Sequence, residues 1–203
     1  MNYKKLGLSL MLLLASACAA YAGVDAQERA VAEITRLGGK VERDEAFPGK
    51  PIIKVDLHGT QVTDADLAIL KKFKSLRTLD LRLTQIGDEG AAHLKNLVNL
   101  QTLNLFRTQL SDRGLAQLKN LKQLQTLLIG GTKVSDAGLV HLKSMTQLKK
   151  LSLFKTEVSD AGLAHLKVLV KLETLLIGGS KISDAGAQEL QRALPRLSFS
   201  ETT

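Results

Sequence analysis

Aliphatic residues follow one pattern in this chain, and the pattern recurs every 24 residues. Each repeat contains an LxxLxL run, such as Leu100, Leu103 and Leu105, and a threonine or serine stands three residues after the last aliphatic position. These hydroxyl residues are Thr60, Thr84, Thr108, Thr132, Thr156 and Ser180. The LxL alternation has the period of a β-strand with one buried face. Six repeats, each with a short strand, are therefore predicted.

A second segment of each repeat has the signature of a helix start. After the threonine come an aliphatic residue and a Ser-Asp pair, as in Val134-Ser135-Asp136, followed by Ala-Gly-Leu. The hydroxyl or carboxylate can cap the first turn, and Asp is favoured at the positive end of the helix dipole. Leu139 and Leu142 then lie three apart on one helix face. Each strand is thus expected to lead into a helix.

A strand and helix of this length cannot bury their apolar sides alone, so the repeats must stack around one shared core. This predicts a curved α/β solenoid over residues 51–199. Residues 23–50 are predicted to cover its open end, with a helix over 25–37, a strand over 40–43 and a turn at 47–49. Residues 193–199 carry the repeat's residue types at a different offset and predict a closing strand. Residues 200–203 are expected to be a tail.

The run Leu151-Ser152-Leu153-Phe154-Lys155-Thr156 resembles the leucine-rich repeat family, in which Asn or Cys takes the place of this threonine. With its V-[ST]-D-x-G-L continuation, the repeat is similar to those of exported bacterial proteins and to the cysteine-containing class of the family. The resemblance covers about residues 51–199. It implies a horseshoe arc with parallel strands on the concave side, helices on the convex side and a partner bound on the concave face.

The first 22 residues have the composition of a secretory signal. Lys4 and Lys5 precede an apolar run, and Ala20-Tyr21-Ala22 forms a small-x-small cleavage site. Residues 15–18 are similar to a bacterial lipobox, which gives lipidation at Cys18 as the alternative. Cys18 is the only cysteine of the chain, so disulfides and thiolate chemistry are not expected. The chain carries a net charge of +8 and remains basic after removal of the signal.

The strand residues between the buried leucines must point outward, which defines a candidate binding face. Along one outward column Phe and Gly alternate, from Phe106 through Gly130 to Phe154, and the strand spacing places the two phenylalanines roughly 10 Å apart. Aromatic anchors within a basic rim are common at interfaces. The predicted partner-binding patch consists of Phe106, Leu128, Phe154 and Leu176, rimmed by Arg107 and Lys155. In the alternative interpretation, each Phe packs over the neighbouring Gly and only covers backbone.

The helix side carries a second candidate surface, a column of lysines that forms a basic ridge. Its members are Lys71, Lys95, Lys119, Lys143 and Lys167. Such a ridge can hold anionic polymer or a membrane surface, whereas the simpler explanation is that a cation is favoured near each helix C-terminus. Aromatic residues make up 3% of the chain and Trp is absent. Nucleic-acid partners are not expected, because single strands need aromatic stacking platforms.

Catalytic and metal chemistry find little support in the sequence. Asp56 and Asp80 are neighbours in one column and thinly resemble a retaining glycosidase pair, but Lys54, His58 and Arg82 surround them and favour an ionic cluster. His93, His141 and His165 share one repeat position, too far apart to converge on one ion. We therefore predict a non-enzymatic protein without metal or cofactor that binds a protein or other macromolecule.

Overall fold

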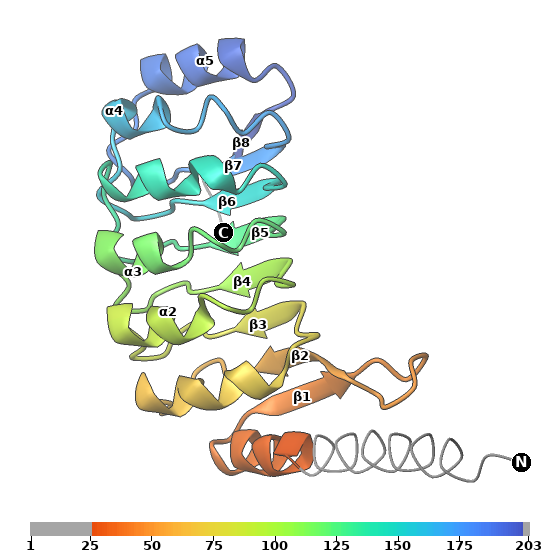
Figure 1. Ribbon diagram of the computed structural model, residues 1–203. Coiled ribbons are helices and arrows are strands. Elements are labelled where there is room, and N and C mark those ends of the chain that lie inside the picture. The colour runs from red at the N-terminus through yellow and green to blue at the C-terminus, as the bar shows by residue number, and fades with distance from the viewer. Residues whose placement is uncertain (1–25, 201–203) are drawn as a thin grey trace, which may run out of the picture.

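The computed structural model describes residues 26–200, which form a stack of strand–helix units (Figure 1). The predicted signal segment, Cys18 and residues 201–203 lie outside this range. The strands are β1 (Lys40–Arg43), β2 (Ile52–Asp56), β3 (Thr78–Asp80), β4 (Thr102–Asn104), β5 (Thr126–Leu128), β6 (Lys150–Ser152), β7 (Thr174–Leu176) and β8 (Ser198–Ser200). After a first helix over residues 26–36, the helical segments are η1 (Ala65–Lys72), α2 (Asp88–Leu94), α3 (Asp112–Gln117), η2 (Gly138–Ser144), α4 (Asp160–Leu163) and α5 (Asp184–Ala193), of which η1 and η2 are 3-10 helices.

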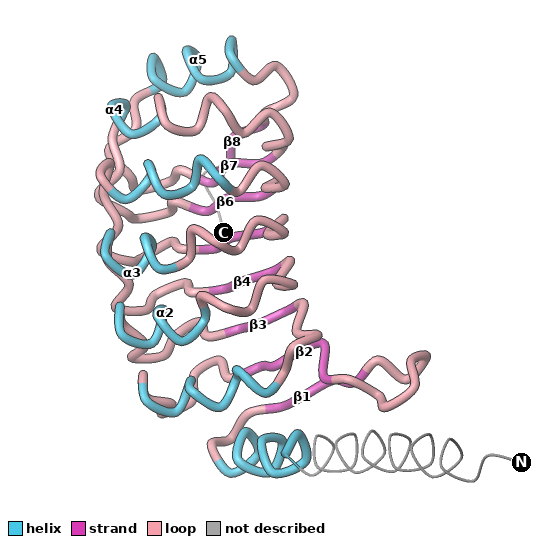
Figure 2. The backbone as a smooth tube through the Cα atoms, in the orientation of Figure 1, coloured by secondary structure: helices cyan, strands magenta, loops and turns pink. Residues whose placement is uncertain are grey.

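The eight strands form one open sheet in chain order, and the helical segments lie against one of its two faces (Figure 2). The β1 strand runs antiparallel to β2, and every later pair is parallel. The parallel register keeps the 24-residue step, because Leu79 pairs with Leu103 and Leu103 with Leu127. The predicted solenoid of parallel strands and helices is confirmed. No helix within residues 26–200 is long and apolar enough to cross a membrane.

The core is one continuous apolar cluster between the sheet and the helices. The LxxLxL leucines are almost completely buried, as Leu100, Leu103 and Leu105 show, and helix residues such as Leu139 and Leu142 reach the same cluster. The helix over 26–36 adds Ala30 and Ile34 to its first end.

The prediction that the pattern slips before the last strand needs correction. The pairing of β7 with β8 sets Leu175 opposite Phe199, which keeps the 24-residue step. The shift is confined to the preceding turn, where Leu197 N–H donates to Leu194 O and Ser198 follows immediately in the strand. In the previous repeat Glu173 separates Leu172 from the strand residue Thr174. Compared with the previous repeat, the last repeat thus has one more residue before this leucine and one fewer between the leucine and the strand.

The repeated hydroxyl residue closes the turn after each strand. Its Oγ donates to the carbonyl oxygen three residues back at 2.6 to 2.8 Å, as from Thr108 to Leu105. Four of these threonines are buried, at Thr84, Thr108, Thr132 and Thr156. A buried hydroxyl must find a partner close by, and the local carbonyl provides one.

The Ser-Asp pairs link consecutive repeats. Asp112 Oδ1 accepts from Ser135 N–H at 2.8 Å and its Oδ2 accepts from Ser135 Oγ at 2.6 Å. The same bonds join Asp88 to Ser111, Asp136 to Ser159 and Asp160 to Ser183. We call this series the Asp–Ser ladder. Three of its serines also cap their own helices, as predicted, by accepting from N–H groups of the first turn.

The glycine of each D-x-G sequence makes room for the ladder. A methyl group built on Gly138 would overlap Asp112 Oδ1 of the preceding repeat and lie 3.3 Å from Asp112 Cα. The other four glycines of this column, Gly90, Gly114, Gly162 and Gly186, face the preceding aspartate in the same way. The motif therefore pairs a carboxylate with the space it needs in the next repeat.

Substitution of Gly138 tests this geometry. Alanine normally favours a helix over glycine by up to about 1 kcal/mol, yet we expect Gly138→Ala to destabilise by roughly 1–3 kcal/mol because of the overlap. Asp112→Ala should cost about 1–3 kcal/mol by leaving Ser135 N–H without its acceptor. The loss of stability in the double variant should be smaller than the sum of the two single losses by about 1 kcal/mol or more. Urea denaturation measures all three, and strict additivity would contradict the packing argument.

The ladder also predicts a pH effect at Asp160. Hydrogen bonds from the Ser183 hydroxyl and backbone N–H hold the pKa of this carboxyl below its usual value. Because the folded pKa is lower than the unfolded one, the carboxylate stabilises the fold above about pH 4 and this contribution is lost as the pH falls through the folded pKa. In Ser183→Ala we expect the Asp160 pKa to rise in an NMR titration, whereas Ser183→Thr should leave it low. Equal pKa values in both variants would contradict the assignment.

Candidate functional site

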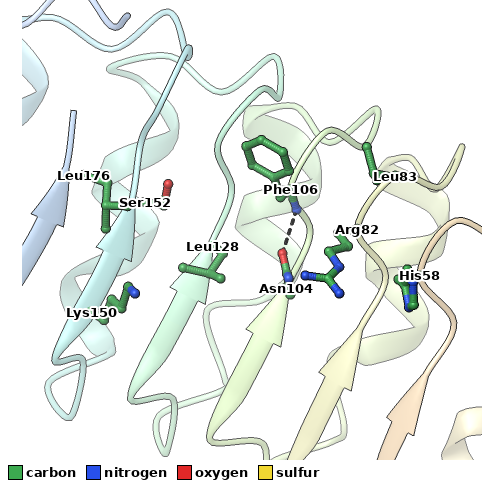
Figure 3. Close-up of a pocket in the computed structure, with 9 residues that line it drawn as sticks. All are labelled: His58, Arg82, Leu83, Asn104, Phe106, Leu128, Lys150, Ser152 and Leu176. Atoms are coloured by element: carbon green, nitrogen blue, oxygen red, sulfur yellow. Dashed lines mark hydrogen bonds between the residues drawn. The ribbon is translucent and has the colours of Figure 1, made fainter. Parts of the chain in front are cut away.

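The exposed face of the sheet, called here the strand face, is hollowed by a depression of about 530 Å³ (Figure 3). Its lining residues come from successive repeats because parallel strands in register bring equivalent positions side by side. They are His58, Arg82, Leu83, Asn104, Phe106, Leu128, Lys150, Ser152 and Leu176. A volume of this size lies in the range of ligand-binding depressions.

Strands β2, β3 and β4 end in the same side-chain arrangement. Asp56, Asp80 and Asn104 each accept, through Oδ1, the backbone N–H two residues ahead, at 3.0 to 3.1 Å. Asp56 Oδ1 also lies 2.8 Å from His58 Nδ1. Burial raises the pKa of Asp56, but the two hydrogen bonds from His58 and the nearby Arg82 charge outweigh it and leave the pKa below its usual value. A general acid needs a raised pKa, so this carboxyl is unsuited to that role.

The two phenylalanines of the predicted patch lean toward each other. Strand spacing predicts about 10 Å between them, whereas their ring centroids are 6.3 Å apart, with the ring planes at 37°. The rings can approach because Gly130 has no side chain between them. A methyl group on Gly130 would lie 3.1 Å from Phe106 Cδ2 and 3.0 Å from Phe154 O. Phe106 therefore covers the backbone of Gly130, as the alternative interpretation expected.

In every repeat, the residue directly after the position of Phe106, Gly130 and Phe154 adopts a left-handed backbone conformation. Its members are Gly59 (φ 65°), Leu83 (58°), Arg107 (53°), Gly131 (69°), Lys155 (49°) and Gly179 (71°). A side chain costs roughly 1–2 kcal/mol in this conformation, so glycine is the least strained choice. Leu83, Arg107 and Lys155 nevertheless occupy it. Arg107 Cζ lies over the Phe106 ring, 5.3 Å from its centroid, and Lys155 Nζ lies over the Phe154 ring, 5.2 Å from its centroid.

The structure distributes the six predicted patch residues unequally. Phe106, Leu128 and Leu176 line the hollow, while Phe154, Arg107 and Lys155 do not. Leu176 is only 4% exposed, and the two phenylalanines and Leu128 are half-buried. Leu176 is thus less exposed than the strand alternation implies.

Sequence reasoning placed several lining residues on the strand face without assigning them to the binding patch. His58 and Arg82 are among the residues that the sequence predicts in an ionic cluster, while strand alternation places Lys150 and Ser152 on the outward side without a predicted role. Ser152 is 2% exposed, and its Oγ has no hydrogen-bond partner among the residues described. It lies beside Gly130, since a methyl group there would be 3.0 Å from the hydroxyl.

The helix side keeps its lysines in water. All five ridge lysines are exposed, and Lys167 pairs with Glu189 at 2.7 Å. Within residues 26–200, Lys71, Lys95, Lys119 and Lys143 form no ion pair. His93, His141 and His165 belong to no group of metal-ligating side chains within the same range.

Comparison with known proteins identifies the class. A family model described as Leucine Rich repeat matches residues 74–94 and 96–118. An internalin (inlF) from Listeria monocytogenes superposes with a TM-score of 0.54 at 21% identity, over 75% of this chain and 50% of that one. Internalin C2 (inlC2) of the same organism gives 0.53 at 19%, over 76% of this chain and 87% of that one. This chain therefore spans half the length of the first relative.

These identities establish the shared fold alone. No curated protein sequence matches this chain significantly. With the LxxLxL repeats, the in-register parallel sheet and the family match over residues 74–94 and 96–118, residues 26–200 have the fold of a leucine-rich repeat solenoid.

The unpaired hydroxyl of Ser152 predicts an unusual mutational response. Removing a buried polar group that lacks a partner relieves its desolvation cost, so Ser152→Ala should leave the free energy of unfolding unchanged or raise it by about 1 kcal/mol. Thr132→Val is the matched control, because the Thr132 hydroxyl is buried and donates to Ile129 O at 2.6 Å. That variant should lose about 1 kcal/mol. Equal losses in urea denaturation would show that the Ser152 hydroxyl is satisfied.

Proposed function

We propose that this chain is an exported, non-enzymatic scaffold that binds a protein or other macromolecule on its strand face. The observation that carries the proposal is the hollow of about 530 Å³ on that face, where apolar side chains meet the cations Arg82 and Lys150. Stacked repeats present extended surfaces of this kind for binding. The signal-like residues 1–22 support export.

The left-handed positions lend separate support. Backbone strain persists where a side chain is wanted for another purpose, and glycine occupies the same position in neighbouring repeats. Leu83 lines the hollow, and 49% of its surface is exposed. Arg107 and Lys155 lie over the rings of Phe106 and Phe154 on the same face. Side chains are therefore kept where bare backbone would be more stable.

A basic envelope component that holds anionic polymer or membrane through the helix-side lysines is the second candidate. It is favoured by the four exposed lysines without acidic partners in the described range. Exposed lysines are also the ordinary surface of a soluble helix layer, so this proposal ranks below the first.

A cross-linked capture from native cell envelope tests both. The full chain after signal removal is compared with Phe106→Ser/Phe154→Ser, with Leu83→Ser/Lys150→Glu and with the helix-side control Lys95→Glu/Lys119→Glu. We expect one protein to be captured by the first and last forms and lost from the two strand-face variants. Denaturation midpoints verify that each variant is folded.

Capture that persists in both strand-face variants and disappears from Lys95→Glu/Lys119→Glu or at high salt would contradict the strand-face proposal. That outcome would assign binding to the lysine ridge, since attraction between exposed charges is screened by salt.

A further inference from the structure

The strand face is electrostatically divided. At its N-terminal end each carboxylate already has a nitrogen partner, because Asp56 contacts His58 Nδ1 at 2.8 Å and Asp80 contacts Arg82 Nε at 3.4 Å. From β4 to β7 the first and last residue of each strand, the Phe–Gly column that follows and the left-handed position contain Arg107, Lys150 and Lys155 and no carboxylate. This half of the face therefore favours a negatively charged partner.

Two cations of the hollow retain unused donors. Arg82 contacts Asp80 at 3.4 Å through Nε and its Nη groups donate no hydrogen bond within residues 26–200, while Lys150 Nζ forms neither an ion pair nor a hydrogen bond there. Figure 3 shows both side chains extending toward the centre of the hollow from opposite sides. Asn104 adds a donor between them, because its Oδ1 accepts from Phe106 N–H at 3.1 Å and its Nδ2 makes no hydrogen bond in the described range.

An apolar surface separates the two cations. In strand order, Arg82 follows β3, Phe106 follows β4, Leu128 ends β5 and Lys150 begins β6. Phe106 and Leu128 are half-buried and line the hollow together. The sequence of chemistry across the face is thus cation, apolar floor, cation.

The spacing of these groups matches an extended chain. Three strand intervals separate Arg82 from Lys150 across the sheet, or about 14 Å. In an extended segment residues i, i+2 and i+4 point to one side, and i lies about 13 Å from i+4. Lys150 is equivalent to Thr78, four residues before Arg82, so the two Cα atoms are also offset by about 13 Å along the strands. The long Arg and Lys side chains must span this offset by extending toward each other over the hollow.

We propose that the hollow binds an extended acidic segment of a partner protein, with carboxylates at i and i+4 and an aliphatic side chain at i+2. The aliphatic group lies on Phe106 and Leu128, and the carboxylates pair with Arg82 and Lys150. This inference rests on the proposed strand-face function and specifies the chemistry of its partner.

Fluorescence anisotropy with labelled synthetic peptides tests the proposal. The probe is Gly-Ser-Glu-Thr-Leu-Thr-Glu-Ser-Gly, compared with peptides in which both Glu become Lys, in which Leu becomes Ser, or in which the two Glu are adjacent. We expect saturable binding of the probe that weakens with salt, a loss of about tenfold or more for each altered peptide, and no binding of the Lys peptide.

Variants of the protein locate the site. Lys150→Gln and Arg82→Gln should each weaken binding of the probe by about tenfold, while the helix-side control Lys95→Gln should leave the affinity unchanged. Equal affinity for all four peptides, an effect of Lys95→Gln as large as that of Lys150→Gln, or no probe binding at millimolar concentration would overturn the proposal. If envelope capture still depended on Leu83 and Lys150 in that case, the strand-face function would stand and only the acidic segment would be wrong.

Discussion

Each repeat of this chain buries its leucines only when another repeat lies against it. The strand and helix leucines of one repeat pack against those of the next repeat. Together they form one apolar cluster with members from Ala30 to Leu197. Hydrophobic burial alone tolerates sliding, since aliphatic side chains have no preferred partner atoms. The Asp–Ser ladder removes this freedom, because Asp112 must meet both donors of Ser135. These directional bonds reinforce the register that the parallel pairing sets along the strand face.

The sequence predicted the architecture well because the relevant information is local and repeated. Leu103 and Leu105 specify a buried strand side in every unit, and the common 24-residue step specifies how units pair. The last repeat was the exception. Its leucine moved by one residue to Leu197 while Phe199 kept the register. Pattern reading followed the leucine, whereas the parallel pairing of β7 and β8 decides the structure.

The candidate site was predictable only in outline. Alternation correctly placed Phe106, Leu128 and Lys150 on one face, since it depends on backbone period. The direction in which a side chain leans depends on its neighbours, so the sequence left open whether the two phenylalanines pack over Gly130, and their close approach is visible only in the structure. The same applies to Ser152, whose unpaired hydroxyl reflects the absence of a suitably placed acceptor nearby. No sequence pattern marks that absence.

The left-handed turn position gives the molecule a way to change without refolding. All six examples, from Gly59 to Gly179, share nearly the same φ angle whether they carry a side chain or none. The backbone therefore forms this turn independently of the residue that occupies it. At Gly59 a side chain would meet nothing within 4 Å, so natural variation or deliberate engineering can place one there at a cost of roughly 1–2 kcal/mol. At Gly131 and Gly179 a Cβ would lie 2.8 Å from Cγ of Arg107 and Lys155, so an exchange there also requires that neighbouring side chain to move. The residue at this turn position can therefore alter the charge and polarity of the strand face, while the stacked core beneath it stays the same.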